Sequence, residues 1–397
     1  MNILFVSSLF PFPTDKGAKI RLLQLMRALS PRHKVSLFAF RSRDASSNPS
    51  LVSAPEDITM YPVSASRLER LISLTKAVGS SKPLQVLYCE SRDARRKLRQ
   101  VTRDNRFDFV IFHLLRMAEY AKEIKSPRVV LDIGDAVSQY LKRSMEFRRS
   151  FWERGLLGIE QRRVEKYERQ RIPDFLCTLV SSEVDKAVLG RMCPVDSMEV
   201  IPNAVDVQHL VPSNTDVFKV QIVFVGNFSY YPNVDAVLTF CRDVLPLVWK
   251  ERPDLVFYAV GASPPKSVRA LARDPRIVVT GTVPDIRAHL KLGSVFVCPV
   301  RFGGGTKFKV LEAMAMGLPV VSTPVGSEGI DVSDGEELFV ARNAQDFAQR
   351  VLQLATDQYL NRKMGSAARR TMELKYDQRI VAKRLESLLV QLRGVDR

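Results

Sequence analysis

The sequence predicts two doubly wound, Rossmann-like α/β domains in tandem. Short apolar runs typical of strands alternate with helical patterns along most of the chain, and the runs are apolar throughout rather than at every second position. Strands of that kind belong to parallel sheets covered by helices. The length of 397 residues exceeds one ordinary core and fits two. Because ligands of such sheets bind at the carboxyl ends of the strands, we expect the site where the two domains face each other across a cleft.

The first half opens with a predicted strand, helix and strand at residues 2–6, 17–29 and 35–40. The predicted alternation continues with strands at 109–112, 128–131 and 175–180 and helices at 116–122 and 138–171. No boundaries are predicted between residues 40 and 107. We expect an N-terminal domain over residues 1–205, with a terminal helix at about 376–397 that packs back on it.

A turn-rich passage at residues 201–214 is the predicted linker, because prolines, asparagines and aspartates interrupt both periodicities there. Residues 206–375 are predicted to form the second domain. Its predicted strands are 222–225, 255–260, 277–280, 295–299 and 319–322, and its predicted helices are 234–249, 268–273, 286–292 and 308–316.

The charge is strongly positive and uneven. The formal net charge is +17, and residues 1–200 hold 35 Lys and Arg against 23 Asp and Glu, a net charge of +12. Such a field attracts nucleic acid, anionic lipid headgroups or phosphorylated intermediates, and charge alone does not choose among them. The sequence shows no signal peptide and no long apolar run, so we expect a cytoplasmic protein. The five cysteines are scattered and predict neither disulfides nor a zinc site.

A glycine loop between a predicted strand and a predicted helix is the strongest sign of a ligand site. It reads Gly303-Gly304-Gly305-Thr306-Lys307-Phe308. Glycines let the backbone approach a diphosphate, the first helix amides point outward unpaired, and Lys307 adds a positive charge. The alternative is a glycine-rich turn whose lysine caps a surface helix.

Glu312 follows within a helix that is otherwise almost entirely apolar. A carboxylate in such a place is costly to bury unless something donates hydrogen bonds to it, and a ribose diol would do so. The alternative is a structural partner for a nearby lysine.

Four separated segments resemble the retaining glycosyltransferases of family 4, which have the GT-B fold. They are residues 201–206, 223–227, 278–285 and 303–321. The resemblance covers nearly the whole chain and is strongest between residues 200 and 330. It implies that the first domain holds an acceptor and that the second binds a nucleotide sugar. The sugar would pass with retention to a glycan, polyprenyl-diphosphate-linked or glycolipid acceptor, in bacterial exopolysaccharide or lipopolysaccharide synthesis.

The resemblance also assigns donor-binding residues. It implies that Glu312 binds the ribose hydroxyls and that the loop of Gly304, Gly305, Thr306, Lys307 and Phe308 binds the phosphates and sugar. Two positions depart from the family pattern: Gly304 stands where a second glutamate contacts the transferred sugar, and Asn227 stands where many relatives have an arginine for the diphosphate. Thr282 and Val283 match the loop that holds the nucleobase, although an ordinary strand-to-helix turn is an equal interpretation.

In the first domain, the resemblance places Gly17 opposite the donor phosphates and His113 against the donor sugar. Arg21 and Asp135 are predicted acceptor-binding residues. Three of these residues have a structural alternative: a plain turn at Gly17, a histidine after a strand whose hydrogen bonds are satisfied at His113, and a carboxylate bonded to its own loop at Asp135.

The predicted chemistry needs neither an enzymic nucleophile nor a metal. His113 and Lys307 are the predicted catalytic residues, with Lys307 and the helix amides stabilising the departing diphosphate. No Asp-x-Asp follows an apolar strand, so metal-independent catalysis without a cofactor is expected. A UDP-sugar is the first expectation for the co-substrate and a GDP-sugar the second.

Three other hypotheses remain open. The charge could mark a nucleic-acid-binding protein, although no recognisable binding module is present, and an epimerase could share the fold. The basic segment at residues 142–171, with Phe147, Phe151, Trp152, Leu156 and Leu157, could lie on the inner face of an anionic membrane or pack on its own domain.

Overall fold

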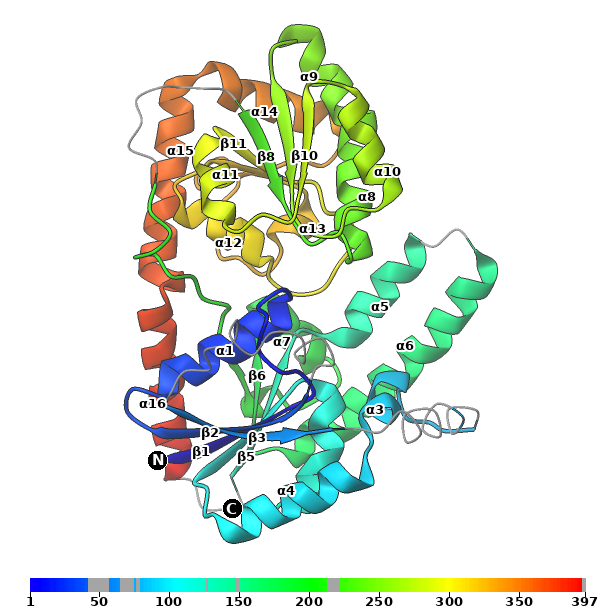
Figure 1. Ribbon diagram of the computed structural model, residues 1–397, viewed down its shortest axis with the longest axis vertical. Coiled ribbons are helices and arrows are strands. Elements are labelled where there is room, and N and C mark those ends of the chain that lie inside the picture. Colours follow the sequence, from blue (N-terminus) through cyan, green and yellow to red (C-terminus); the bar gives the residue numbers. More distant parts are fainter. Residues whose placement is uncertain are drawn as a thin grey trace. The chain divides into compact units, whose positions relative to one another are not determined.

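The computed structural model describes residues 1–41, 57–64, 75, 79–125, 128–147, 150–212 and 221–394. Residues 213–214 of the predicted linker, 148–149 of the basic segment and 395–397 of the terminal helix lie outside this part. The chain divides into two compact units, Met1–Pro202 with Val381–Arg397 and Asn203–Ile380. Each is built on one parallel sheet (Figure 1).

Unit 1 is built on a sheet of seven strands in the order β3-β2-β1-β4-β5-β6-β7. Their bounds are β1 (Asn2–Ser7), β2 (Lys34–Phe40), β3 (Ile58–Val63), β4 (Phe109–His113), β5 (Val129–Gly134), β6 (Cys177–Val180) and β7 (Met198–Val200). All neighbours are parallel, with Phe5 opposite Leu37 on one side and Ile111 on the other. Because β1 and β4 are almost wholly buried, both faces are apolar, as the sequence predicted.

The helices of unit 1 connect these strands. They are α1 (Gly17–Leu29), α3 (Leu84–Cys89), α4 (Arg92–Asp104), α5 (Val137–Glu146), α6 (Phe151–Arg171), α7 (Glu183–Gly190) and the 3-10 segment η3 (Leu115–Glu123). The helix predicted at 17–29 is confirmed. The single helix predicted over 138–171 is wrong, since two helices occupy it. The last helix, α16 (Gln378–Arg393), returns beside this unit, where Arg32 and His33 contact Glu386.

Unit 2 repeats the plan with six parallel strands in the order β10-β9-β8-β11-β12-β13. Their bounds are β8 (Gln221–Val225), β9 (Val256–Val260), β10 (Ile277–Gly281), β11 (Val295–Cys298), β12 (Val320–Ser322) and β13 (Phe339–Val340). The covering helices are α8 (Tyr231–Thr239), α9 (Leu245–Glu251), α10 (Lys266–Arg269), α11 (Ile286–Leu292), α12 (Phe308–Ala315), α13 (Pro324–Ser327), α14 (Ala344–Thr356) and α15 (Gln358–Thr371).

The helix predicted at 234–249 is interrupted, because a π-helical turn (Phe240–Val244) separates α8 from α9. Pro246 cannot donate the backbone hydrogen bond that a continuous helix requires. The helix predicted at 268–273 is likewise half α and half 3-10. Among the described residues, no helix is both long and apolar enough to cross a membrane.

Candidate functional site

The candidate site of unit 2 lies where the strand order of its sheet reverses. Successive strands run outward in one direction from β8 and in the other from β11, and these two strands are neighbours. Loops leaving their carboxyl ends therefore diverge and open a crevice, the usual ligand position in such sheets. Gly226 follows β8, and the glycine loop predicted from the sequence follows β11.

The glycine loop has a backbone shape that requires glycine at two positions. Gly303 has φ +148° and Gly305 has φ +61°, conformations that other residues rarely adopt. Thr306 is buried, and its carbonyl accepts a hydrogen bond from the Asn203 side chain at 3.4 Å. The loop therefore brings the chain tightly into the start of α12.

The first turn of α12 offers backbone amides. Val310 and Leu311 donate to the carbonyl of Lys307 at 2.9 and 3.3 Å. The amides of Phe308 and Lys309 precede these donors, so they belong to the unpaired beginning of the helix, where the helix dipole favours an anion. The contact of Phe308 and the loop with a diphosphate stays a prediction.

Lys307 lies in this loop, with its ammonium turned back on the loop. Its Nζ donates to the carbonyls of Gly304 at 3.1 Å and Gly305 at 2.5 Å. That geometry matches the capping alternative for the side chain. A phosphate contact by Lys307 stays a prediction, and it requires the ammonium to exchange those carbonyls for a ligand.

Glu312 lies one turn into α12, partly buried among apolar neighbours. Desolvation raises the pKa of its carboxyl group to about 7, against an ordinary 4.5, although Lys309 favours the ionised form. A carboxylate held at such a cost is typical of functional sites.

Lys309 is the site residue that the sequence interpretation missed. It lies three residues before Glu312, hence on the same face of α12. Its Nζ donates to Asn233 Oδ1 at 2.5 Å and lies 4.3 Å from the centre of the Phe224 ring. Desolvation lowers the pKa of this ammonium to about 8. The spacing of three residues between Lys309 and Glu312 could have shown that the two side chains share one helix face. It was missed because Lys307 directly follows the glycines and was given the positive charge of the site.

Lys309 connects α12 to the loop after β8. Asn233, whose Oδ1 accepts from Lys309, donates through Nδ2 to the carbonyl of Asn227 at 2.7 Å. A Cβ at Gly226 would lie 2.9 Å from both Lys309 Nζ and Asn233 Cγ, so a larger residue there would displace these two side chains. Asn227 therefore belongs to the site, where its own side chain accepts from the amide of Ser229.

Thr282 and Val283 lie further along the same edge, after β10, with β9 between β10 and β8. Thr282 is exposed, and Val283 packs partly against the core. Their contact with a nucleobase stays a prediction.

In unit 1, His113, Arg21 and Asp132 form a buried charged cluster. Asp132 Oδ1 accepts from Arg21 Nε at 2.9 Å and Nη2 at 2.7 Å, and Oδ2 lies 2.7 Å from His113 Nδ1. His113 Nε2 lies 3.0 Å from the carbonyl of Ala18, and Arg21 also donates to the carbonyl of Ile201. Both ring nitrogens therefore face oxygen atoms of unit 1.

This cluster matches the structural alternative for His113, and it buries Arg21 as well. His113 is fully buried and Arg21 is 4% exposed, so contact of either with sugar or acceptor stays a prediction that requires rearrangement. Gly17 is exposed at the first position of α1, and Asp135 accepts from Ser181 Oγ at 3.0 Å.

Arg116 is a second residue without a role in the sequence interpretation. It lies after β4, the strand beside which the order of unit 1 reverses, and Nε donates to Ser8 Oγ, after β1, at 2.6 Å. Burial lowers the pKa of its guanidinium, and no carboxylate among the described residues pairs with it. A cation at this edge suits an anionic ligand.

Comparisons with known proteins bear on this geometry. Sucrose-phosphate synthase from Thermosynechococcus elongatus has a TM-score of 0.75 at 15% identity, with 99% of each chain covered. Anabaena HepE, solved in complex with UDP-glucose, has a TM-score of 0.71 at 14% identity, with 98% of this chain and 100% of that one covered. The fold is GT-B. The prediction of two Rossmann-like domains of this class is confirmed.

The GT-B chain also matches at the level of sequence. Residues 219–357 match the family described as Glycosyl transferases group 1, a stretch that includes the loops after β8 and β11. A Klebsiella pneumoniae protein described as an uncharacterized 44.6 kDa protein in the cps region is 25% identical over 370 residues, covering 88% of this chain and 90% of that one. Together these findings support a GT-B glycosyltransferase.

Among the described residues, no group of three or more His, Cys, Asp and Glu side chains is placed to hold a metal ion. Lys307 and Lys309 place positive charge near the glycine loop, and Arg301 in the same loop is paired with Asp235.

Proposed function

We propose that this protein transfers a sugar from a nucleotide sugar, a UDP-sugar before a GDP-sugar, to a glycan or lipid-linked acceptor, with retention of anomeric configuration as in glycosyltransferase family 4. The reaction belongs to the synthesis of a bacterial cell-surface polysaccharide or glycolipid. The UDP-glucose bound by HepE and the cps region of the Klebsiella relative support donor class and setting.

The observation that carries this proposal is the opposed pair of desolvated charges on α12. Lys309 and the first amides of the helix supply positive charge for a diphosphate, and Glu312, one turn further, accepts from the ribose hydroxyls. A donor with both groups satisfies both desolvated side chains at once. A nucleic-acid-binding protein would have no use for that carboxylate.

The chemistry that these residues perform is stabilisation of the leaving group. As the bond from the anomeric carbon to the diphosphate breaks, negative charge grows on the phosphate oxygen, and fixed amides and an ammonium lower the energy of that state. This replaces the divalent ion that a metal-dependent transferase would use. Transfer with retention of the anomeric configuration requires no nucleophile from the protein in this proposal.

Arg116 completes the proposal on the acceptor side. Among the described residues, the hydrogen-bond partner of this guanidinium is the Ser8 hydroxyl, and such a cation at the edge of the unit 1 sheet fits a phosphate group on the acceptor, as in a polyprenyl-diphosphate-linked glycan.

The test of donor class is a thermal-shift series with UDP, GDP, ADP, CMP and dTDP, each confirmed by calorimetry. Binding to the native state alone raises the melting temperature, so we expect the largest increase with UDP. A response to GDP alone would correct the nucleobase. The absence of binding for the whole series would overturn the proposal.

Donor affinity is expected to be highest between about pH 7 and pH 8. Below this window Glu312 gains a proton and can no longer accept from both ribose hydroxyls; above it Lys309 loses the proton that attracts the diphosphate. Calorimetry with the UDP-sugar, whose diphosphate ester does not titrate in this range, measures the dependence of donor affinity on pH.

Lys309→Met should weaken donor binding about 10-fold or more at pH 7 and remove the decline in affinity above pH 8. Lys291→Met, an exposed lysine on α11, should leave both unchanged.

A further inference from the structure

The first half of α6 exposes a row of large apolar side chains. Phe151, Trp152, Leu156 and Ile159 are 79%, 80%, 69% and 52% exposed. Trp152, Leu156 and Ile159 follow one another at helical spacings of four and three residues, so they form one stripe. Soluble surfaces rarely expose such contiguous apolar groups without a binding role.

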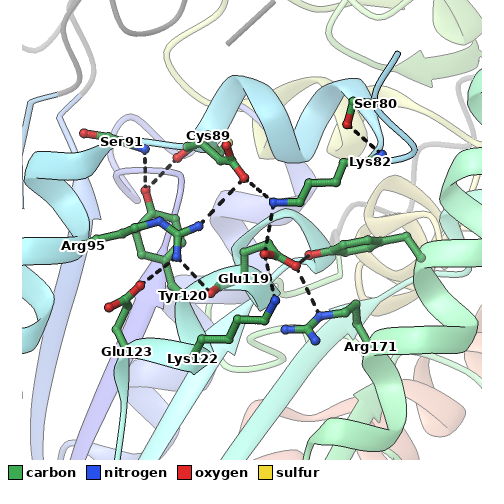
Figure 2. A network of polar contacts seen from close by, with 12 residues as sticks. Ser80, Lys82, Cys89, Ser91, Arg95, Glu119, Tyr120, Lys122, Glu123 and Arg171 are labelled. Carbon is green, nitrogen blue, oxygen red and sulfur yellow. Dashed lines mark hydrogen bonds and ion pairs between the residues drawn. The ribbon is translucent and has the colours of Figure 1, made fainter. Parts of the chain in front are cut away.

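The second half of the same helix is fixed to unit 1 by polar contacts. Figure 2 shows Glu119, which is buried, in contact with Lys82, Lys122 and Arg171 at 3.2, 3.3 and 3.4 Å. Tyr167, on the same helix as Arg171, also donates to Glu119 at 3.2 Å. The pKa of Glu119 stays below its ordinary value because these cations outweigh its desolvation.

Two more contacts hold α6, one to the start of α5 and one to α3. The amide of Ser138 donates to Glu168 at 3.2 Å, and Glu160 accepts from the amide of Leu84 at 2.7 Å. Glu168 and Val164 are fully buried, on a different side of α6 from the stripe. The stripe therefore is not the face that packs on its own unit. In Figure 1, the connected ends of α5 and α6 extend away from the sheet of unit 1.

Positive charge accompanies the apolar stripe. The described residues from Lys142 to Arg163, which leave out 148–149, include five Lys and Arg against three Glu, a net charge of +2. Two copies of this surface would repel each other in a symmetric dimer, where identical patches meet. An anionic bilayer complements both properties, since aromatic side chains enter the interfacial region while cations remain among the headgroups.

We propose that the α5–α6 pair is an interfacial membrane anchor. Phe151, Trp152, Leu156 and Ile159 insert at the headgroup level of an anionic bilayer, and the contacts of Glu119 and Glu168 hold the pair rigidly enough to present them. This inference does not depend on the donor site.

The test uses the whole protein and vesicles of phosphatidylcholine with and without phosphatidylglycerol. We expect co-flotation with the anionic vesicles that weakens with added salt. The chain has two tryptophans, so Trp249→Phe leaves Trp152 as the reporter. Its emission should shift to the blue on anionic vesicles as the indole leaves water.

The variants separate the stripe from other exposed apolar groups. The double variant Trp152→Ser, Leu156→Ser should reduce flotation at least about 10-fold, because it removes two of the three residues of the stripe. The matched control Tyr359→Ser, Leu374→Ser changes residues that are 77% and 62% exposed in unit 2 and should float as the wild type does. An unchanged far-ultraviolet circular dichroism spectrum and urea midpoint would show that the double variant is folded. Undiminished flotation of the double variant, absent binding by the wild type, or a dimer that the double variant dissolves would each overturn the proposal.

Discussion

Replacing Glu312 with glutamine is expected to weaken nucleotide-sugar binding about 10- to 100-fold at pH 8 while making the protein more stable. Hydrogen bonds to a charged acceptor contribute on the order of 1.5 to 3 kcal/mol, and the amide accepts from one ribose hydroxyl where the carboxylate accepts from two. Substitutions at a structural ion pair would instead lower stability. A ligand-binding role for Glu312 therefore predicts that Glu312→Gln raises the free energy of unfolding, whereas a structural role predicts that it lowers it.

The increase in stability follows from the direction of the pKa shift. The folded pKa of about 7 lies above the ordinary value of 4.5, so the unfolded state loses its proton first as the pH rises. The ionised carboxylate then penalises folding progressively between about pH 4.5 and 7 and fully above pH 7. Removing the charge should raise the free energy of unfolding by on the order of 1 to 3 kcal/mol at pH 8 and by almost nothing at pH 4.

Urea denaturation at both pH values, with donor calorimetry on the same samples, makes this measurement. Glu336→Gln is the matched control, because that carboxylate is exposed in the same unit. A Glu312→Gln variant that is less stable at pH 8 and binds donor normally would assign Glu312 to the structural role and remove the principal support for the donor site.

Local pattern was sufficient for the elements that position the site. The helix at 17–29 and the buried strands before Gly226 and the glycine loop follow from periodicity and glycine placement, which depend on neighbouring residues alone. The π-helical turn before Pro246 was missed because the surrounding apolar pattern is continuous. The strand β3 was missed because Pro62 argues against a strand, although an edge position tolerates it.

Side-chain partners across long sequence distances could not be predicted in the same way. Arg21 and Asp132 are 111 residues apart, and only the pairing of β1 with β4 and of β4 with β5 brings α1 and the end of β5 together. Without that topology, Arg21 was interpreted as an acceptor-binding residue. The same limit applied to Lys309, whose partner Asn233 lies in another helix.

Asp132→Asn is expected to be the most destabilising single substitution in unit 1, with a loss of about 3 to 5 kcal/mol. The carboxylate is fully buried and accepts from Arg21 and lies against His113, so its removal leaves a guanidinium and an imidazole without their counter-charge. Burial opposes its ionisation, but these two cationic partners outweigh burial and hold the pKa of Asp132 below its ordinary value. Its contribution is therefore present above the unfolded pKa and lost as the pH falls through the folded one.

Far-ultraviolet circular dichroism in urea reports this loss. In a Trp152→Phe background, Trp249 fluorescence gives an internal control, because that residue belongs to unit 2. Asp135→Asn, at a half-buried carboxylate that follows β5, should cost about 1 kcal/mol or less.

The stability of Asp132→Asn also bears on the role of His113. One ring nitrogen of His113 contacts Asp132 and the other contacts the carbonyl of Ala18. If His113 contacts a sugar, the contacts that orient its ring are therefore the same ones that stabilise the fold. If the Asp132→Asn variant has normal stability and reduced sugar transfer, the cluster serves catalysis. If the variant loses stability while unit 2 still binds donor, the cluster stabilises the fold of unit 1.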